Sequence, residues 1–177
     1  VRASLLHERR VGEKSTLTQE IRLAAGSRRL EFVTHVDWHE DRKMLRTSFP
    51  TTVRTDQATF EIQYGHLQRP THRNTSWDLA RFEVVGHKWV DLSDPTYGVA
   101  LLNDCKYGHK VVQHVLDLNL LRSPKSPDPE ADMGEHDFTY ALFPHRGGYR
   151  EGQVIQEGYA LNVPLGAFAT TSHDGTL

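Results

Sequence analysis

Two polar runs hold most of the side chains in this sequence that could bind a ligand or take part in a reaction. They are Arg69-Pro-Thr-His-Arg-Asn-Thr-Ser-Trp-Asp78 and Gly98-Val-Ala-Leu-Leu-Asn-Asp-Cys-Lys-Tyr-Gly108. The first run places guanidinium, amide and carboxylate groups beside an indole ring. Proteins bind sugars with planar polar groups, which hydrogen-bond to neighbouring hydroxyls, and with aromatic rings that stack on C–H faces. The first run therefore has the composition of a carbohydrate-binding loop.

Three interpretations of the first run are open. It could bind a sugar on its own, or it could line an active-site rim or a domain interface, where Trp and Arg are common anchors. It could also brace itself, with Asx turns at Asn74 and Asp78 and with Trp77 closing the end of the fold. The candidate residues under all three interpretations are Arg69, His72, Arg73, Asn74, Trp77 and Asp78.

In the second run, polar residues follow the apolar stretch Val99 to Leu102. Asn103, Asp104, Lys106 and Tyr107 could position a substrate at the end of a strand. Alternatively they form a turn in which Lys106 neutralises Asp104, a surface pair worth about 0–1 kcal/mol. Cys105 has no catalytic base beside it in sequence, so we predict a buried structural thiol rather than a nucleophile.

His35, Asp37 and His39 alternate along one extended segment and would share one face of a strand. Their side chains are acceptable zinc or iron ligands. On a straight strand, however, such neighbours cannot converge on one ion. The spacing favours a solvated strand face, and we predict no metal site in this chain.

An acid-rich loop follows, with Asp128, Glu130, Asp132, Glu135 and Asp137. Paired carboxylates cleave glycosidic bonds in many hydrolases. Here prolines interrupt the acids, and no apolar neighbours are present to raise the pKa of one of them. A solvated loop, or one that abuts a partner domain, is the favoured interpretation, and no catalytic residue is assigned.

Composition limits the class of protein. The chain has 177 residues, enough for one domain with a sizeable core, and 21 basic against 23 acidic residues give a formal charge of −2. This balance argues against nucleic acid or an anionic membrane as a partner, and no apolar run is long enough for a membrane span. A single cysteine excludes an internal disulfide and favours a reducing compartment, the cytoplasm.

Period-two alternation dominates the sequence and predicts strands with one buried and one wetter face. Turn residues such as Ser93-Asp94-Pro95 separate them, and two longer loops are expected at Gln68 to Leu79 and Ser123 to Glu135. Helical spacing occurs only at Gln153 to Leu161. The predicted strands are Thr16 to Leu23, Leu30 to Trp38, Met44 to Phe49, Ala58 to Tyr64, Arg81 to Val90, Gly98 to Leu102, Val111 to Leu121 and Asp137 to Pro144.

This pattern predicts an all-β fold, a two-sheet antiparallel sandwich with at most one or two short helices. We expect residues 1–177 to form a single domain. Val1 opens the chain on strand-like sequence without a Met, and Ser172 to Leu177 end it without a terminating element. We therefore expect a domain that is part of a longer protein.

Both polar runs, together with Arg122-Ser-Pro-Lys-Ser-Pro-Asp-Pro-Glu-Ala-Asp-Met-Gly134 and Phe138-Thr-Tyr-Ala-Leu-Phe-Pro-His145, resemble a known family. They are similar to the C-terminal β-rich half of glycoside hydrolase family 38, the α-mannosidases, in the branch with the cytosolic, vacuolar and many bacterial enzymes. The resemblance runs from about Gln19 to about Leu165. It implies a large sandwich of the mutarotase-like supersandwich kind.

The resemblance also implies a function. Such enzymes are retaining α-mannosidases whose N-terminal half supplies an aspartate nucleophile and a divalent metal, usually zinc. None of those metal-binding motifs occurs in this chain. The resemblance implies a non-catalytic domain that packs on the catalytic domain, helps to form the cleft for a mannose-containing oligosaccharide, and belongs to an enzyme that often self-associates. The cleft or interface candidates are Arg69, His72, Arg73, Asn74, Trp77, Asp78, Asn103, Asp104 and Tyr107.

Two other functions are open on the sequence alone. One is an autonomous carbohydrate-binding module. The other is an independent metal-dependent or mutarotase-type enzyme that would use some of the eleven histidines of the chain.

Overall fold

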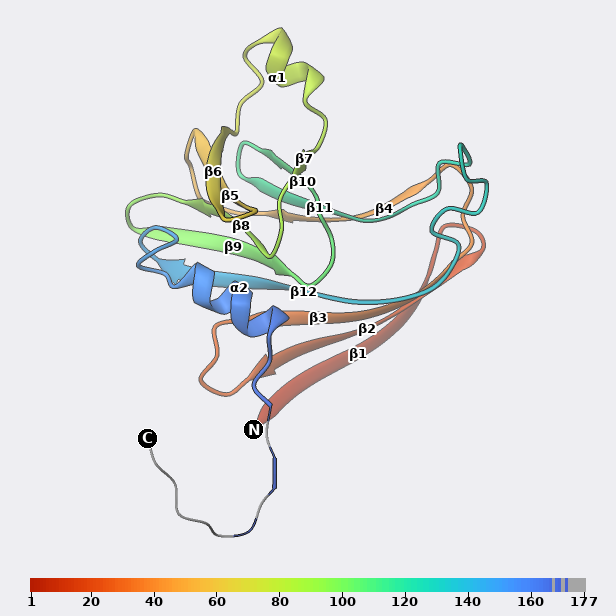
Figure 1. Cartoon of the computed structure of the whole chain (residues 1–177), viewed down its shortest axis with the longest axis horizontal. Coiled ribbons are helices and arrows are strands. Elements are labelled where there is room, and N and C mark those ends of the chain that lie inside the picture. Colours follow the sequence, from red (N-terminus) through yellow and green to blue (C-terminus); the bar gives the residue numbers. More distant parts are fainter. Residues whose placement is uncertain (167, 170, 172–177) are drawn as a thin grey trace.

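Two antiparallel β-sheets of unequal width form the body of the molecule (Figure 1). The computed structural model describes residues 1–166, 168–169 and 171. The C-terminal stretch Ser172 to Leu177, which we noted for its lack of a terminating element, lies outside the described residues. The all-β sandwich predicted from the alternation is confirmed, and two short helices accompany it.

The wider sheet has eight strands, and only some of them are neighbours in sequence. Its central strands therefore come from distant parts of the chain. In spatial order the strands are β1 (Arg2–Val11), β2 (Ser15–Ala24), β3 (Leu30–Trp38), β12 (Gly134–Arg146), β9 (Tyr97–Asn103), β8 (Trp89–Ser93), β5 (Gln57–Ile62) and β6 (Gly65–Pro70).

The narrower sheet has four strands and lies against one face of the wider one (Figure 1). Its order is β4 (Met44–Pro50), β11 (Val115–Arg122), β10 (Gly108–Val112) and β7 (Val84–Val85). The edge strand β7 is only two residues long, and the chain reaches it directly from helix α1 (Ser76–Ala80).

The main core lies between the two sheets. In β3 the even positions Phe32, Thr34, Val36 and Trp38 are buried and the odd ones are partly exposed, as the alternation predicted. Opposite them, β11 contributes several leucines that are almost fully buried: Leu116, Leu118, Leu120 and Leu121. Alternation on one face is thus sufficient to build this layer.

The central strands are buried on both faces. All residues of β9 except Tyr97 are buried, because helix α2 (Val154–Asn162) covers the outer face of the wider sheet. A second apolar cluster forms there around Trp89, Phe143 and Val154. The helix predicted at Gln153 to Leu161 is therefore confirmed, within one residue at each end.

Two segments that we predicted as single strands each form two separate strands in the structure. The segment Arg81 to Val90 divides into β7 and β8, which belong to different sheets. The division falls at Gly86, where an added Cβ would lie 2.9 Å from the His109 ring. The segment Val111 to Leu121 is the hairpin β10–β11, which turns at Gln113 with a positive φ of 54°. Because no Gly or Pro marks that turn, the alternation of apolar and polar residues runs through it and predicted a single strand.

The two predicted long loops are shorter than expected. The first three residues of Gln68 to Leu79 belong to the unpredicted strand β6, and its end forms most of helix α1. The last two residues of Ser123 to Glu135 belong to β12. Within the described residues, neither helix has the length and apolarity needed to span a membrane.

Candidate functional site

The first polar run forms a projecting connection between the two sheets. We call residues 71–83 the hook, because they leave β6, turn through α1 and enter β7 at the top of Figure 1. Helix α1 has only five residues and is held by a capping box. Thr75 Oγ1 accepts a hydrogen bond from the Asp78 backbone N–H at 3.1 Å, and the Asp78 carboxylate accepts one from the Thr75 N–H at 3.2 Å.

Asp78 is the buried anchor of the hook. The hydroxyl of Thr75 also donates to its carboxylate at 2.8 Å, Arg81 approaches at 3.3 Å, and His72 Nδ1 lies 3.7 Å away. The hydrogen bond from Thr75, followed by lesser contributions that include Arg81 and His72, lowers the pKa of Asp78. Asp78 therefore braces the hook, as one of the three interpretations proposed.

Trp77 does not close the end of the fold, so that part of the bracing interpretation is wrong. Its side chain is 82% exposed, and Leu79 and Phe82 are 56% and 74% exposed. The indole thus lies largely in solvent on this short helix. Val85 on β7 and Tyr107, just before β10, are exposed as well. We call the three exposed apolar residues of the hook, Trp77, Leu79 and Phe82, the hook patch.

Beneath the hook lies a small pocket between β5, β6, β7 and β10. It encloses about 30 Å³, and its polar lining comes mostly from cationic and imidazole side chains: Arg69, His72, Arg73, Arg81, His109 and Lys110. The structure thus brings Arg69, His72, Arg73 and Asp78 together. Asn74 and Trp77 are exposed and are not among the residues that line this pocket.

His109 is a pocket residue that sequence reasoning did not identify. Its ring is almost fully buried, and burial is the main cause that lowers its pKa to about 3, with Arg69 and His87 adding to the effect. The imidazole is therefore neutral at physiological pH. The only sequence signal was its position in the polar–apolar alternation of β10, which gives no indication of burial.

The second polar run forms a turn, and two of its candidates shape it. The buried Asn103 amide donates to the His87 carbonyl at 2.8 Å and accepts from the Lys106 N–H at 2.6 Å. The Asp104 carboxylate accepts from the Thr139 N–H at 2.8 Å. Lys106 does not neutralise Asp104 as expected; its ammonium lies 4.5 Å from the centroid of the Phe138 ring.

Tyr107 and Cys105 both face outward from this turn. Tyr107 is half exposed and contacts the His87 ring, with centroids 5.1 Å apart. The prediction of a buried Cys105 is wrong. Cys105 is exposed, because it lies in the turn that follows Asn103, the buried last residue of β9. Partial desolvation and then the Asp104 carboxylate raise the pKa of Cys105 to about 11. Little thiolate forms at neutral pH, which agrees with the prediction that it is no nucleophile.

His35 on β3 and His39, just after its end, each lie beside a carboxylate rather than beside one another. His35 Nδ1 lies 2.9 Å from Asp137 on β12, and His39 Nε2 lies 2.6 Å from Asp37. The region that the structure describes contains no group of three or more His, Cys, Asp or Glu side chains that could hold a metal ion.

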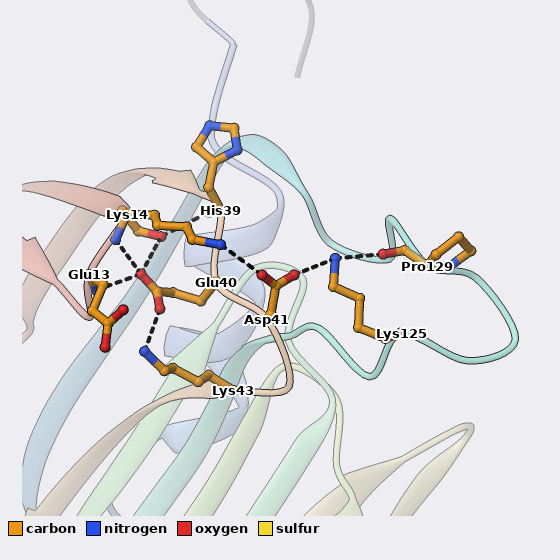
Figure 2. A network of polar contacts seen from close by, with 9 residues as sticks. Glu13, Lys14, His39, Glu40, Asp41, Lys43, Lys125 and Pro129 are labelled. Atoms are coloured by element: carbon orange, nitrogen blue, oxygen red, sulfur yellow. Dashed lines mark hydrogen bonds and ion pairs between the residues drawn. The ribbon is translucent and has the colours of Figure 1, made fainter.

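The acid-rich loop lies away from the hook. Figure 1 places the loop at the right-hand end of the sandwich and the hook at the top. Figure 2 shows why: Lys125 of this loop bridges to Asp41 at 2.6 Å, and Lys14 reaches the same carboxylate at 2.8 Å. The loop is thereby joined to the β1–β2 turn and to the β3–β4 connection.

Glu40 organises that network, although no pattern in the sequence predicted this role. Its buried carboxylate accepts hydrogen bonds from the backbone N–H groups of Glu13 and Lys14, at 2.7 and 2.6 Å, and from Lys43 at 2.6 Å (Figure 2). These contacts, led by the Lys43 side chain, lower its pKa to about 2. Because cations and N–H donors satisfy the carboxylates, this network braces the loops against one another.

Fold and site together define a β-sandwich domain whose polar loops are largely engaged in bracing and whose hook exposes aromatic side chains. The model of the glycosyl hydrolases family 38 C-terminal domain matches residues 1–130. The chain therefore belongs to that family.

Two sequence relatives agree with this family assignment. Alpha-mannosidase 2C1 of Homo sapiens is 55% identical over 162 residues, covering 92% of this chain and 16% of the relative. Alpha-mannosidase G of Dictyostelium discoideum is 51% identical over 168 residues, covering 91% of this chain and 16% of the relative. The chain thus spans 16% of the length of these relatives.

A solved structure supports the fold. The crystal structure of an alpha-mannosidase from Enterococcus faecalis superposes with a TM-score of 0.80 at 23% identity, covering 92% of this chain and 19% of that one. At this identity the likeness concerns the fold alone.

Proposed function

We propose that this chain is the non-catalytic C-terminal β-domain of a retaining α-mannosidase that removes terminal α-mannosides from oligosaccharides. In this proposal residues 1–177 are one domain of a longer polypeptide. The domain packs on a catalytic domain and completes the rim of its substrate cleft. The nucleophile and a divalent metal, zinc, which contacts sugar hydroxyls, belong to the catalytic domain. The enzyme acts in the cytoplasm and self-associates.

The observation that carries the proposal is the hook patch. Monomeric proteins rarely leave several large apolar side chains exposed together unless they bind something. Trp77 and Phe82 are the kind of residue that anchors protein interfaces. Their projecting position suits a partner domain better than a single sugar, because sugar sites are concave. The names of the relatives and the small share of their length that this chain covers point the same way.

The candidate residues divide into two roles under this proposal. The exposed candidates contact the catalytic domain or the substrate rim: Asn74, Trp77 and Tyr107. The others position them through the capping box, the turn and the pocket: Arg69, His72, Arg73, Asp78, Asn103 and Asp104.

Comparing the isolated chain with the complete polypeptide that carries it tests this function. Hydrolysis of an aryl α-mannoside is expected from the complete polypeptide only. Titration calorimetry of the isolated chain with mannose and mannobiose should detect no binding tighter than millimolar. Tighter binding would favour an autonomous carbohydrate-binding module, and metal-dependent hydrolysis by the isolated chain would contradict the non-catalytic role.

A further inference from the structure

The pocket beneath the hook contains a partly buried cation, Arg69, that forms no ion pair with a carboxylate of the described residues. The guanidinium of Arg69 lies 4.5 Å from the centroid of the Phe60 ring, and its Nη1 atom is inaccessible and has no hydrogen-bond partner in the described structure. Burial, and then the like charge of Arg81, lower the pKa of Arg69. Partial removal of a charge from water without a partner is unfavourable, so an anion that binds to Arg69 would be stabilising.

The acids nearest to Arg69 are already engaged. Asp78 caps α1 and pairs with Arg81 at 3.3 Å, while Glu83 pairs with Arg46 on β4. Arg73 and Lys110 also line the pocket. Cationic groups therefore exceed the acids that could compensate them.

A second unpartnered group lies in the same wall. His109 is 1% exposed, and its Nε2 has no hydrogen-bond partner among the described residues. Arg69, which is partly buried, and His109, which is fully buried, thus line one cavity, and each has an inaccessible nitrogen without a hydrogen-bond partner in the described structure. Such unsatisfied groups indicate a site for a polar ligand.

We infer that this pocket is an anion site, and that its occupant is the carboxylate of an Asp or Glu side chain from another part of the complete polypeptide. The inference rests on the proposed function, because that function supplies the covering domain. A guanidinium matches a carboxylate in a planar, two-point arrangement. The free volume of about 30 Å³ admits a group of that size and excludes a sugar ring.

The rim of the pocket explains why the occupant comes from a protein. Phe82 of the hook patch also lines this pocket and is 74% exposed. A domain that covers Trp77, Leu79 and Phe82 would therefore cover the mouth and exclude water from the Arg69–carboxylate pair, which strengthens the pair.

Arg69→Met tests the inference, because Met keeps the apolar contact with Phe60 and removes the charge. In the isolated chain the melting temperature should stay the same or rise, since an uncompensated charge is lost. In the complete polypeptide it should fall, by roughly 2–4 °C, because a carboxylate loses its partner. Arg54→Met, at an exposed arginine, is the matched control and should change neither. A fall in the isolated chain, or no fall in the complete polypeptide, overturns the inference.

Small anions distinguish a side-chain occupant from a free one. Acetate and inorganic phosphate are titrated at constant ionic strength while the Arg69 side-chain N–H resonance is followed. Acetate should shift it saturably in the isolated chain, and neither anion should shift it in the complete polypeptide, where the site is filled. Equal shifts in both proteins would assign a free anion instead, and no shift in the isolated chain would exclude an anion site.

These readouts do not depend on catalysis. A complete polypeptide without α-mannosidase activity would contradict the proposed function and leave the melting and titration results interpretable. An active enzyme that is insensitive to Arg69→Met would contradict the anion site alone.

Discussion

Thr75 and Asp78 cap each other at the start of α1, with Thr75 Oγ1 accepting from the Asp78 N–H at 3.1 Å and the Asp78 carboxylate accepting from the Thr75 N–H at 3.2 Å. A helix of five residues cannot be stable on its own in water. The orientation of the exposed hook therefore depends on this reciprocal pair.

We predict that Thr75→Ala lowers the free energy of unfolding by about 0.5–2 kcal/mol, because the Asp78 N–H loses its side-chain acceptor. Urea denaturation of the isolated chain measures the change. Thr75→Ser keeps the hydroxyl and is the matched control. Equal stability of the Ala and Ser variants would show that the cap contributes nothing.

The network around Glu40 predicts a dependence of stability on pH. Its pKa is about 2 in the folded chain against an ordinary value of 4.5. Because the folded pKa is the lower one, the stabilising contribution is complete above about pH 4.5 and is lost as the pH falls towards 2. Glu40→Gln should therefore be less stable than the wild type at pH 7, and the difference should shrink between pH 4.5 and 2.

Urea denaturation at pH 7, 4 and 3 measures this difference. Glu135→Gln, at an exposed acid near the start of β12, is the control for the removal of one surface charge and should show only a small difference at pH 7. A Glu40→Gln difference that stays constant down to pH 3 would contradict the role we give to Glu40.

The buried pair of His145 and Asp91 lies so close to Gly152 that adding one methyl group at Gly152 should lower the stability of the chain. His145 Nε2 lies 2.7 Å from Asp91, and both side chains are fully inaccessible. A Cβ at Gly152 would lie 2.2 Å from His145 Nδ1. Gly152→Ala should destabilise the chain by about 1–3 kcal/mol, the usual cost of overpacking. At Gly65 an added Cβ would meet nothing within 4 Å, so Gly65→Ala should be far milder; equal losses in thermal unfolding would contradict this explanation.

Alternation was sufficient to predict the layers but not the turns. Residues such as Phe32, Val36 and Trp38 alternate with polar ones, and the structure buries them as expected. The turn at Gln113 could not be predicted, because it uses a positive φ at a residue that is neither Gly nor Asn. Nor could the break at Gly86, because it depends on the distant ring of His109.

Local sequence identified the candidate loops but not their surroundings. The pattern Thr75 to Asp78 is a helix-capping signature that can be seen in sequence. Whether Trp77 lies inward or outward depends on where the sheets end, which no local pattern specifies. The burial of Glu40 and His109 likewise depends on contacts between segments far apart in the chain, since Glu40 binds the turn at Glu13 and Lys14.

The hook patch gives the most direct test that this domain completes a mannosidase. The complete polypeptide carrying Trp77→Asp and Phe82→Asp should lose at least about tenfold in kcat/KM for an aryl α-mannoside, or fail to hold its domains together, because charge at an interface anchor is strongly unfavourable. Tyr64→Asp, at a fully exposed aromatic on the β5–β6 turn, is the control and should retain activity. Full activity and unchanged stability in the double variant would show that the hook faces solvent in the enzyme, and the proposal would fail.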